Sequence, residues 1–142
     1  MALEDDRSSW KIAAILVARL IFAGLFAMAA IFKFIDMSST ASFIAAAGFP
    51  VSSLLAWCAA LLESALVLCL LTGAFFSEAC LAAAAYVLFL AFAFHGPGRW
   101  AGNQAEFGFF VDHFTFIAGL LFAAVHGPGR ILALRHGVLG RT

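Results

Sequence analysis

Charged residues are scarce in this chain. Asp, Glu, Lys and Arg together make up 11% of its 142 residues, whereas a soluble domain carries about 25%. Apolar residues make up 65%, so water is the wrong solvent for most of this chain. The eight basic and eight acidic residues cancel, which excludes an electrostatic argument for nucleic acid or for a polybasic lipid-binding patch. The composition therefore predicts a protein whose surroundings are a lipid bilayer.

Cysteine is equally sparse, and its spacing is uninformative for metals. Cys58, Cys69 and Cys80 form no CxxC pair, which argues against a structural zinc site and against a disulfide framework. We expect small apolar packing residues, although Cys58 and Cys69 share a helix face and leave a redox role open. The chain also has no motif for a nucleotide, a flavin, an iron–sulfur cluster or a nucleophile. It is therefore not expected to be a complete enzyme alone.

Four apolar segments are long enough to cross a bilayer, which requires about 20 residues per helix. They cover residues 12–35, 51–72, 78–95 and 107–126. The start, "MALEDDRSSWK", lacks the basic region of a secretory signal, so the first segment is expected to be an uncleaved membrane helix. Residues 39–47 are too few to cross and predict a short interfacial helix. The expected fold is all-α, a four-helix integral membrane bundle forming one domain over residues 1–142.

Basic residues predict the orientation of this bundle through the positive-inside rule. Five lie at the ends that carry the two termini and two lie on the opposite side. We expect both termini in the cytoplasm, in an inner membrane of the bacterial type. The residues counted are Arg7, Lys11, Arg130, Arg135 and Arg141 against Lys33 and Arg99.

The string HGPGR occurs twice, at residues 95–99 and 126–130. The third and fourth spans are antiparallel, so the two copies should lie on opposite membrane faces and cannot form one site. Glycine followed by proline is typical of a helix end. We interpret both copies as helix stops.

Two ionisable residues lie deep inside the first two spans. Such groups usually face the bundle interior or a water-filled cavity. At 1.5 Å per residue, Glu63 and Arg19 differ in depth by about 6 Å, so we predict an Arg19–Glu63 ion pair, direct or through water. Two interpretations stay open: a structural pair that fixes helix register, or a functional group that is a proton carrier or the acid of a quinone site.

A second polar group is expected in the outer half of the membrane. We expect Asp112 to pair with Lys33, and His113 to approach His95 across antiparallel helices. The two histidines could relay protons or bind a quinone head group, ligate a metal or haem, or form interface hydrogen bonds. Phenylalanines cluster nearby and suit a flat isoprenoid quinone or a lipid tail. The members of the group are Lys33, Asp36, His95, Arg99, Glu106, Asp112 and His113.

The order of these features resembles the DoxX family of membrane proteins. The resemblance extends from "ARLIFAGLFAMAAIFKF" through "GFP", "LLESALVLCLLTG" and "AFAFH" to "GLLFAAVHGPGR". The corresponding positions are Arg19, Lys33, Glu63, His95 and residues 127–130. Relatives often carry a basic residue before Asn or Asp early in the fourth span, where this chain has Val111-Asp112-His113. The resemblance implies a four-helix subunit, tied in some members to sulfur-compound oxidation with electrons passed to quinone.

The expected function is an accessory or anchoring subunit of a larger redox complex with other protein subunits. It could contribute to a quinone-side site through the six residues Glu63, His95, His113, Asp112, Arg19 and Lys33. A purely structural or assembly subunit is one alternative. A small transporter is another, because buried charges also mark permeation paths.

Overall fold

The computed structural model describes residues 2–134 and 137–139, and every regular element in that part of the chain is helical. The elements are α1 (Ala2–Ile35), α2 (Met37–Ala46), α3 (Ser52–Thr72), α4 (Phe76–His95), the 3₁₀ helix η1 (Pro97–Arg99) and α5 (Gln104–His126). Four apolar spans lie in these helices, at Ser9–Ile35, Ser52–Thr72, Phe76–Arg99 and Gln104–His126. The predicted all-α class with four membrane-length helices is confirmed.

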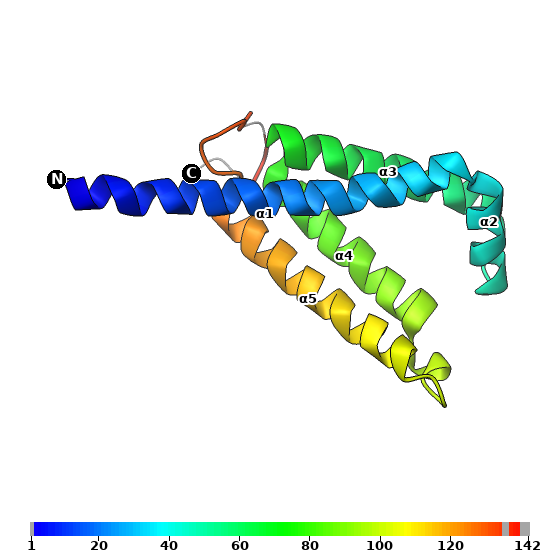
Figure 1. The fold of residues 1–142 in the computed structure, drawn as a ribbon. Helices are drawn as coiled ribbons and strands as arrows, with labels where there is room; N and C mark the ends of the chain where they lie inside the picture. The colour runs from blue at the N-terminus through cyan, green and yellow to red at the C-terminus, as the bar shows by residue number, and fades with distance from the viewer. Residues whose placement is uncertain (1, 135–136, 140–142) are drawn as a thin grey trace.

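The four long helices converge at one end and spread apart at the other (Figure 1). We call the first the narrow end; it holds the α3–α4 turn and residues 127–134 and 137–139. The second, which holds α2 and η1, is the open end. Helix α1 packs along α3 and α4 packs along α5, but no Cα atoms of α1 and α5 lie within 8 Å of each other. The bundle is therefore two helix pairs, joined through α3 and α4.

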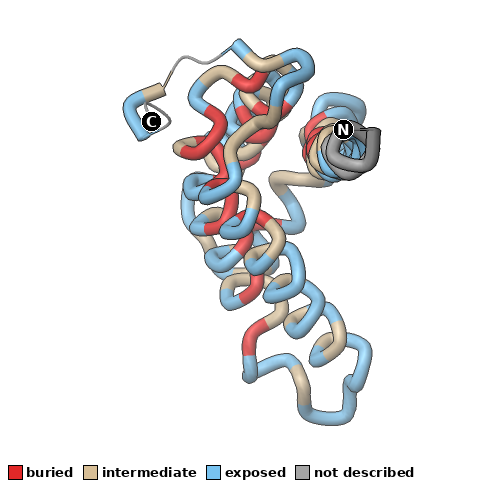
Figure 2. The backbone as a smooth tube through the Cα atoms, turned by 90° about the vertical axis from the view of Figure 1, so that its left-hand side faces the viewer, coloured by how far each residue is buried: buried red, intermediate tan, exposed pale blue. Residues whose placement is uncertain are grey.

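Small side chains make the contacts between the helices close. Ala56, Ala60, Ala83 and Ala91 are completely buried, and residues of this size let neighbouring helix backbones approach. Buried positions follow the inner helix faces, whereas most of the outer surface is exposed (Figure 2). The exposed surface is rich in Phe, Leu, Ile and Val, which suits contact with lipid acyl chains.

Glycine ends α3 and makes room for the C-terminal segment. Gly73 adopts a φ of 74°, and its N–H donates to the carbonyl of Cys69 over 2.8 Å. A Cβ atom at Gly73 would lie 3.0 Å from Cα of Ala133 and 3.1 Å from Cβ of Pro128. The positive φ and the close crossing both favour glycine at this position.

The two HGPGR strings end helices at opposite ends of the molecule, as predicted. His95 is the last residue of α4 at the open end, and His126 is the last residue of α5 at the narrow end. Gly96 carries the chain out of α4 in an extended conformation, and Pro97 begins η1. Shared helix-stop chemistry accounts for the repeat.

The short helix α2 begins two residues before the predicted start, because Asp36 caps it. The Asp36 carboxylate accepts hydrogen bonds from the N–H of Ser39 (2.9 Å) and the hydroxyl of Ser38 (2.8 Å). The bond from the Ser39 backbone, followed by that from Ser38, lowers the pKa of Asp36 below its ordinary value. Asp36 thus fixes the turn that carries the chain from α1 into α2.

Candidate functional site

A buried carboxylate lies at the centre of the candidate site. Glu63, in the middle of α3, is 2% exposed. The Lys33 ammonium of α1 donates to both carboxylate oxygens of Glu63, over 2.8 and 2.9 Å. The Tyr86 hydroxyl of α4 donates to Oε1 of Glu63 over 2.9 Å. Three helices are therefore joined through one carboxylate, which has the paired and hydrogen-bonded environment that a buried charge requires.

The predicted Arg19–Glu63 pair is wrong, and the direction in which helical side chains lean explains the error. Side chains lean toward the N-terminus of their own helix. In antiparallel α1 and α3, this lean moves the Arg19 and Glu63 heads apart, whereas it brings the Lys33 and Glu63 heads together. An estimate from backbone depth alone omits this displacement, which amounts to several ångströms for long side chains. The prediction that Asp112 pairs with Lys33 is also wrong. Lys33 binds Glu63, and α5, which carries Asp112, has no Cα atom within 8 Å of α1.

Arg19 instead binds backbone carbonyls at the narrow end. Its side chain is 3% exposed, and its five N–H groups find five acceptors. The carbonyls are those of Leu70, Leu71, Pro128, Ile131 and Leu132, at 2.7–3.1 Å. Two of them belong to the last turn of α3, which has no helical partner for them. Arg19 therefore fastens the C-terminal segment to α3 and has no remaining donor for a ligand.

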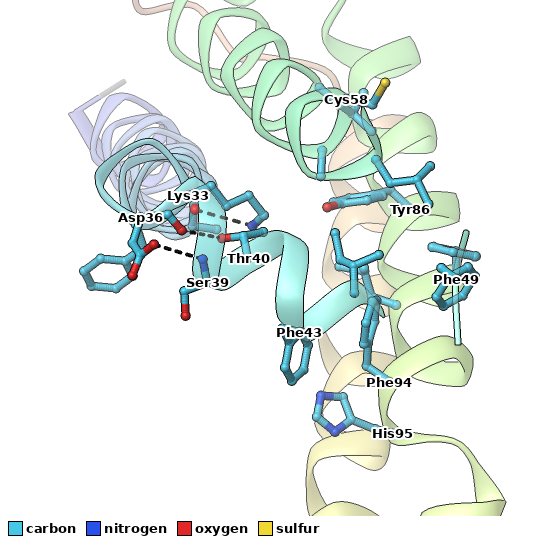
Figure 3. Close-up of a pocket in the computed structure, with 18 of the residues that line it drawn as sticks. Lys33, Asp36, Ser39, Thr40, Phe43, Phe49, Cys58, Tyr86, Phe94 and His95 are labelled. Atoms are coloured by element: carbon cyan, nitrogen blue, oxygen red, sulfur yellow. Dashed lines mark hydrogen bonds between the residues drawn. The ribbon is translucent and has the colours of Figure 1, made fainter. Parts of the chain in front are cut away.

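A cavity of about 740 Å³ lies at the open end, between the α1–α3 pair and the α4–α5 pair. Figure 3 shows Lys33 and Tyr86 facing each other across it, with Phe43, Phe94 and His95 farther along. Most of its wall is apolar, and its polar groups come from α1, α2, α4 and α5. Residues lining it include Lys33, Asp36, Phe43, Phe49, Cys58, Leu62, Tyr86, Phe89, Leu90, Phe94, His95 and His113. Its size and its few polar groups are typical of a small-molecule pocket.

The cavity has two polar regions at different depths along α4. Lys33 and Tyr86 form the inner region, which is nearer the middle of α4, and their hydrogen bonds go mainly to Glu63. His95 lies nine residues beyond Tyr86 on α4, about 14 Å along the helix axis. The rings of Phe43 and Phe94 stack at 5.1 Å between their centroids and lie between the two regions in Figure 3. The two polar regions of the cavity are therefore separated by a stretch of aromatic wall.

Two histidines form the outer polar region. The rings of His95 and His113 lie 5.3 Å apart, so their predicted approach is found. Nδ1 of His95 lies 2.7 Å from the Glu106 carboxylate, and Nδ1 of His113 lies 2.6 Å from the Phe109 carbonyl. Both partners accept, so each Nδ1 carries a proton. The Nε2 atom of each ring is left for a ligand or water.

Neighbouring groups hold His95 in place. The Trp100 indole donates to the His95 carbonyl over 2.8 Å, and the Trp100 ring packs edge-on against Phe110 at 5.0 Å. The Glu106 side chain is 22% exposed at the start of α5, so His95 connects the cavity to a partly exposed carboxylate. Its carboxylate can balance the charge of a protonated His95 ring.

The six residues predicted from the sequence therefore separate into three places. Lys33, His95 and His113 line the cavity, and Glu63 lies behind it. Arg19 is at the narrow end, and Asp112 is exposed on α5. Sequence reasoning missed Tyr86 and gave Glu106 no role. Tyr86 is the only tyrosine, and a lone hydroxyl in an apolar span was a signal that it needed a polar partner.

Metal ligation receives no support from the geometry. No group of three or more His, Cys, Asp or Glu side chains within residues 9–134 and 137–139 is arranged to hold a metal ion. His95 and His113 offer two Nε2 atoms, short of the three or four ligands of the usual protein metal sites.

The sequence model of the DoxX family matches residues 14–96, more than half of the chain. The chain belongs to the DoxX family. The match covers most of α1 and all of α2 to α4, with Arg19, Lys33, Glu63, Tyr86 and His95. It ends before α5, so His113, Glu106 and the second HGPGR lie outside it. No curated protein and no solved structure gives a significant match. Together, the family and the helix lengths make this a multi-pass membrane protein.

Proposed function

We propose that this DoxX-family protein is an accessory membrane subunit of a redox complex, and that its cavity binds the head group of an isoprenoid quinone. One observation carries the proposal: an apolar cavity of about 740 Å³, lined by the membrane-length helices, includes two histidines whose Nδ1 atoms are already hydrogen-bonded, so that their Nε2 atoms can face a ligand. A flat ring with a polyisoprenoid tail combines the two chemistries that this cavity offers.

The outer polar region suits the head group better than the inner one. Lys33 and Tyr86 already donate to Glu63, so few of their hydrogen-bonding positions are free. A protonated His95 paired with Glu106 can donate Nε2–H to a ligand carbonyl. The neutral ring can accept a hydrogen bond from a ligand hydroxyl. The donor set therefore suits both the oxidised and the reduced form of a quinone.

The aromatic wall suits the remainder of the ligand. Phe43 and Phe94 provide stacked rings beside His95, and Phe89, Leu90 and Leu62 continue the apolar lining. Aromatic and aliphatic surfaces of this kind bind flat rings and branched hydrocarbon tails. We therefore propose that the tail leaves the cavity into lipid rather than along a protein-enclosed channel.

The test is to purify the protein with its native lipid and to measure quinone per protein after solvent extraction. His95→Gln and His113→Gln are expected to reduce the bound quinone severalfold. The matched control is His126→Gln, which changes a histidine at the narrow end and should leave the quinone content unchanged. Equal quinone in all variants, or none in the wild-type protein, would refute the cavity assignment.

The subunit assignment has its own test in the assembled complex. If the protein contributes to the quinone site, His95→Gln should lower quinone reduction per complex while complex abundance stays constant. The alternative role, a structural or assembly subunit without chemistry, predicts the opposite: lower abundance with unchanged activity per complex. The ratio of activity to abundance separates the two.

A further inference from the structure

A second feature of α5 lies outside the cavity: the carboxylate of Asp112. It is eight residues beyond Gln104, about 12 Å along the helix, and inside the apolar span Gln104–His126. Its side chain is exposed. Among the side chains that the structure describes, those of residues 9–134 and 137–139, the two ion pairs use other acids, Glu63 and Glu106. An acidic group at this depth is costly unless it meets a partner, and it marks a functional position by default.

The surroundings of Asp112 allow a helix to come close. Gly108 lies one turn before it and Thr115 one turn after it on the same face of α5. A Cβ atom added at Gly108 would meet nothing within 4 Å, so this part of the face is open. Small residues one turn apart let two helix backbones approach, and a polar group between them can then form an interhelical hydrogen bond.

The same face is covered only near the narrow end. A Cβ atom added at Gly119 would lie 2.8 Å from the Phe22 ring, so the Phe22 side chain of α1 covers the face there. Toward the open end α1 and α5 diverge (Figure 1), and none of their Cα atoms lie within 8 Å. Only Leu120 and Ala124 of α5 are buried. In a closed four-helix bundle a neighbouring helix would cover this face, but none of the helices that the structure describes covers it beside Asp112.

We propose that the face formed by Gly108, Asp112 and Thr115 is the docking site for a transmembrane helix of another protein, one that carries a Lys or Arg side chain at the depth of Asp112. Charge complementarity identifies the occupant. A cation provides the partner that the carboxylate lacks, and the small residues admit its helix.

A second copy of this chain does not provide that cation. Lys33 is bound to Glu63, and Arg19 uses all five of its N–H groups on carbonyls. Arg99 lies in η1, before the start of α5 at Gln104, and Asp112 is about 12 Å along α5 from that start. Two copies meeting through this face would bring two Asp112 carboxylates together, and like charges repel. The partner is therefore a different chain.

This inference deepens the subunit part of the proposed function and is independent of whether the cavity binds a quinone. The protein is reconstituted into vesicles with a donor fluorophore on its terminus. The probe is a synthetic Leu/Ala transmembrane peptide with one central Lys and an acceptor fluorophore. The reference peptide has Leu in place of that Lys. Energy transfer reports association, and a central Lys can reach Asp112 in either peptide orientation.

The Lys peptide is expected to associate about threefold to tenfold more tightly than the Leu peptide with the wild-type protein. This preference should vanish in Asp112→Asn and weaken in Gly108→Leu, which keeps the charge and blocks close approach. The matched control Asp36→Asn, which removes an acid at the same end of the molecule, should keep the preference. Equal binding of both peptides, or a preference retained in Asp112→Asn, would overturn the proposal.

Self-association that is lost in Asp112→Asn would also overturn it, in favour of a second copy. If the peptide experiment fails while quinone retention is normal, the docking proposal is refuted and the assignment of the cavity to a quinone is unaffected.

Discussion

Lys33 and Tyr86 meet at the same oxygen of Glu63: Oε1 accepts from the ammonium over 2.8 Å and from the hydroxyl over 2.9 Å. The three side chains come from α1, α3 and α4, so this oxygen couples three of the four membrane-length helices. The carboxylate stabilises the cavity wall by holding both donors in place. Substitutions at these positions should therefore have a larger effect on the free energy of unfolding than on ligand binding.

Loss of Glu63 alone should be strongly destabilising. Glu63→Ala leaves the Lys33 ammonium without its counter-charge, and breaking a buried pair in this way costs about 3–5 kcal/mol. The double variant Lys33→Met/Glu63→Leu removes both charges and should recover most of that loss. Equilibrium unfolding in mixed detergent micelles measures both variants. A double variant no more stable than Glu63→Ala would contradict the assignment of the pair.

Tyr86→Phe tests the hydroxyl with little change in shape. It removes one hydrogen bond to a charged group, a loss of about 1.5–3 kcal/mol of unfolding free energy. The same unfolding measurement applies, and Phe89→Leu, which changes an aromatic residue in the same wall without a hydroxyl, is the matched control. In the proposed account quinone retention should fall less in Tyr86→Phe than in His95→Gln, because the head group lies in the outer region.

Arg19→Lys should loosen the C-terminal segment while the spans stay folded. An ammonium has three donors, so at least two of the five carbonyls bound by Arg19 lose their partner. The N–H of Leu134, which donates to the Thr72 carbonyl over 2.8 Å, should then exchange with deuterium at least several-fold faster. Arg99→Lys is the control, since Arg99 is exposed in η1. Unchanged exchange at Leu134 would show that Arg19 does not hold this segment.

The cap of α2 should weaken in acid. The folded-state pKa of Asp36 is lowered below 3.8 by its bonds from Ser39 and Ser38. Its contribution is therefore fully present above the unfolded pKa, and it is lost as the pH falls below 3.8 and through the folded pKa. Amide exchange at Ser39, corrected for the intrinsic effect of pH, should rise in that range. In Asp36→Asn, which can cap without titrating, this pH dependence should disappear.

The sequence contained most of the fold, because apolar runs of span length and helix stops such as Gly73 are local signals. It also located His95, His113, Lys33 and Glu63 as polar groups that lipid would not tolerate alone. The partners of those groups lie far away in the sequence, so local patterns did not predict them. Which cation reaches Glu63 depends on the lean of side chains in antiparallel helices, and the backbone carbonyls bound by Arg19 have no signature in the sequence.

The separation of α1 from α5 at the open end could not be predicted from the sequence either. The surface of an apolar membrane helix has a similar residue composition whether a neighbouring helix or a lipid acyl chain covers it. The divergence of α1 from α5, and with it the cavity and the exposed face around Asp112, follows from three-dimensional packing. Glu106 illustrates the same limit, because its role depends on its 2.7 Å distance from His95.

Photo-crosslinking with an azido-quinone analogue in reconstituted vesicles tests the central claim most directly. The account predicts that the label falls on the α4–α5 segment around His95 and His113, that excess unlabelled quinone suppresses it, and that His95→Gln reduces it while His126→Gln does not. Labelling spread evenly over the outward faces of the helices, including exposed positions such as Phe122 and Val125, and insensitive to competing quinone would contradict the account.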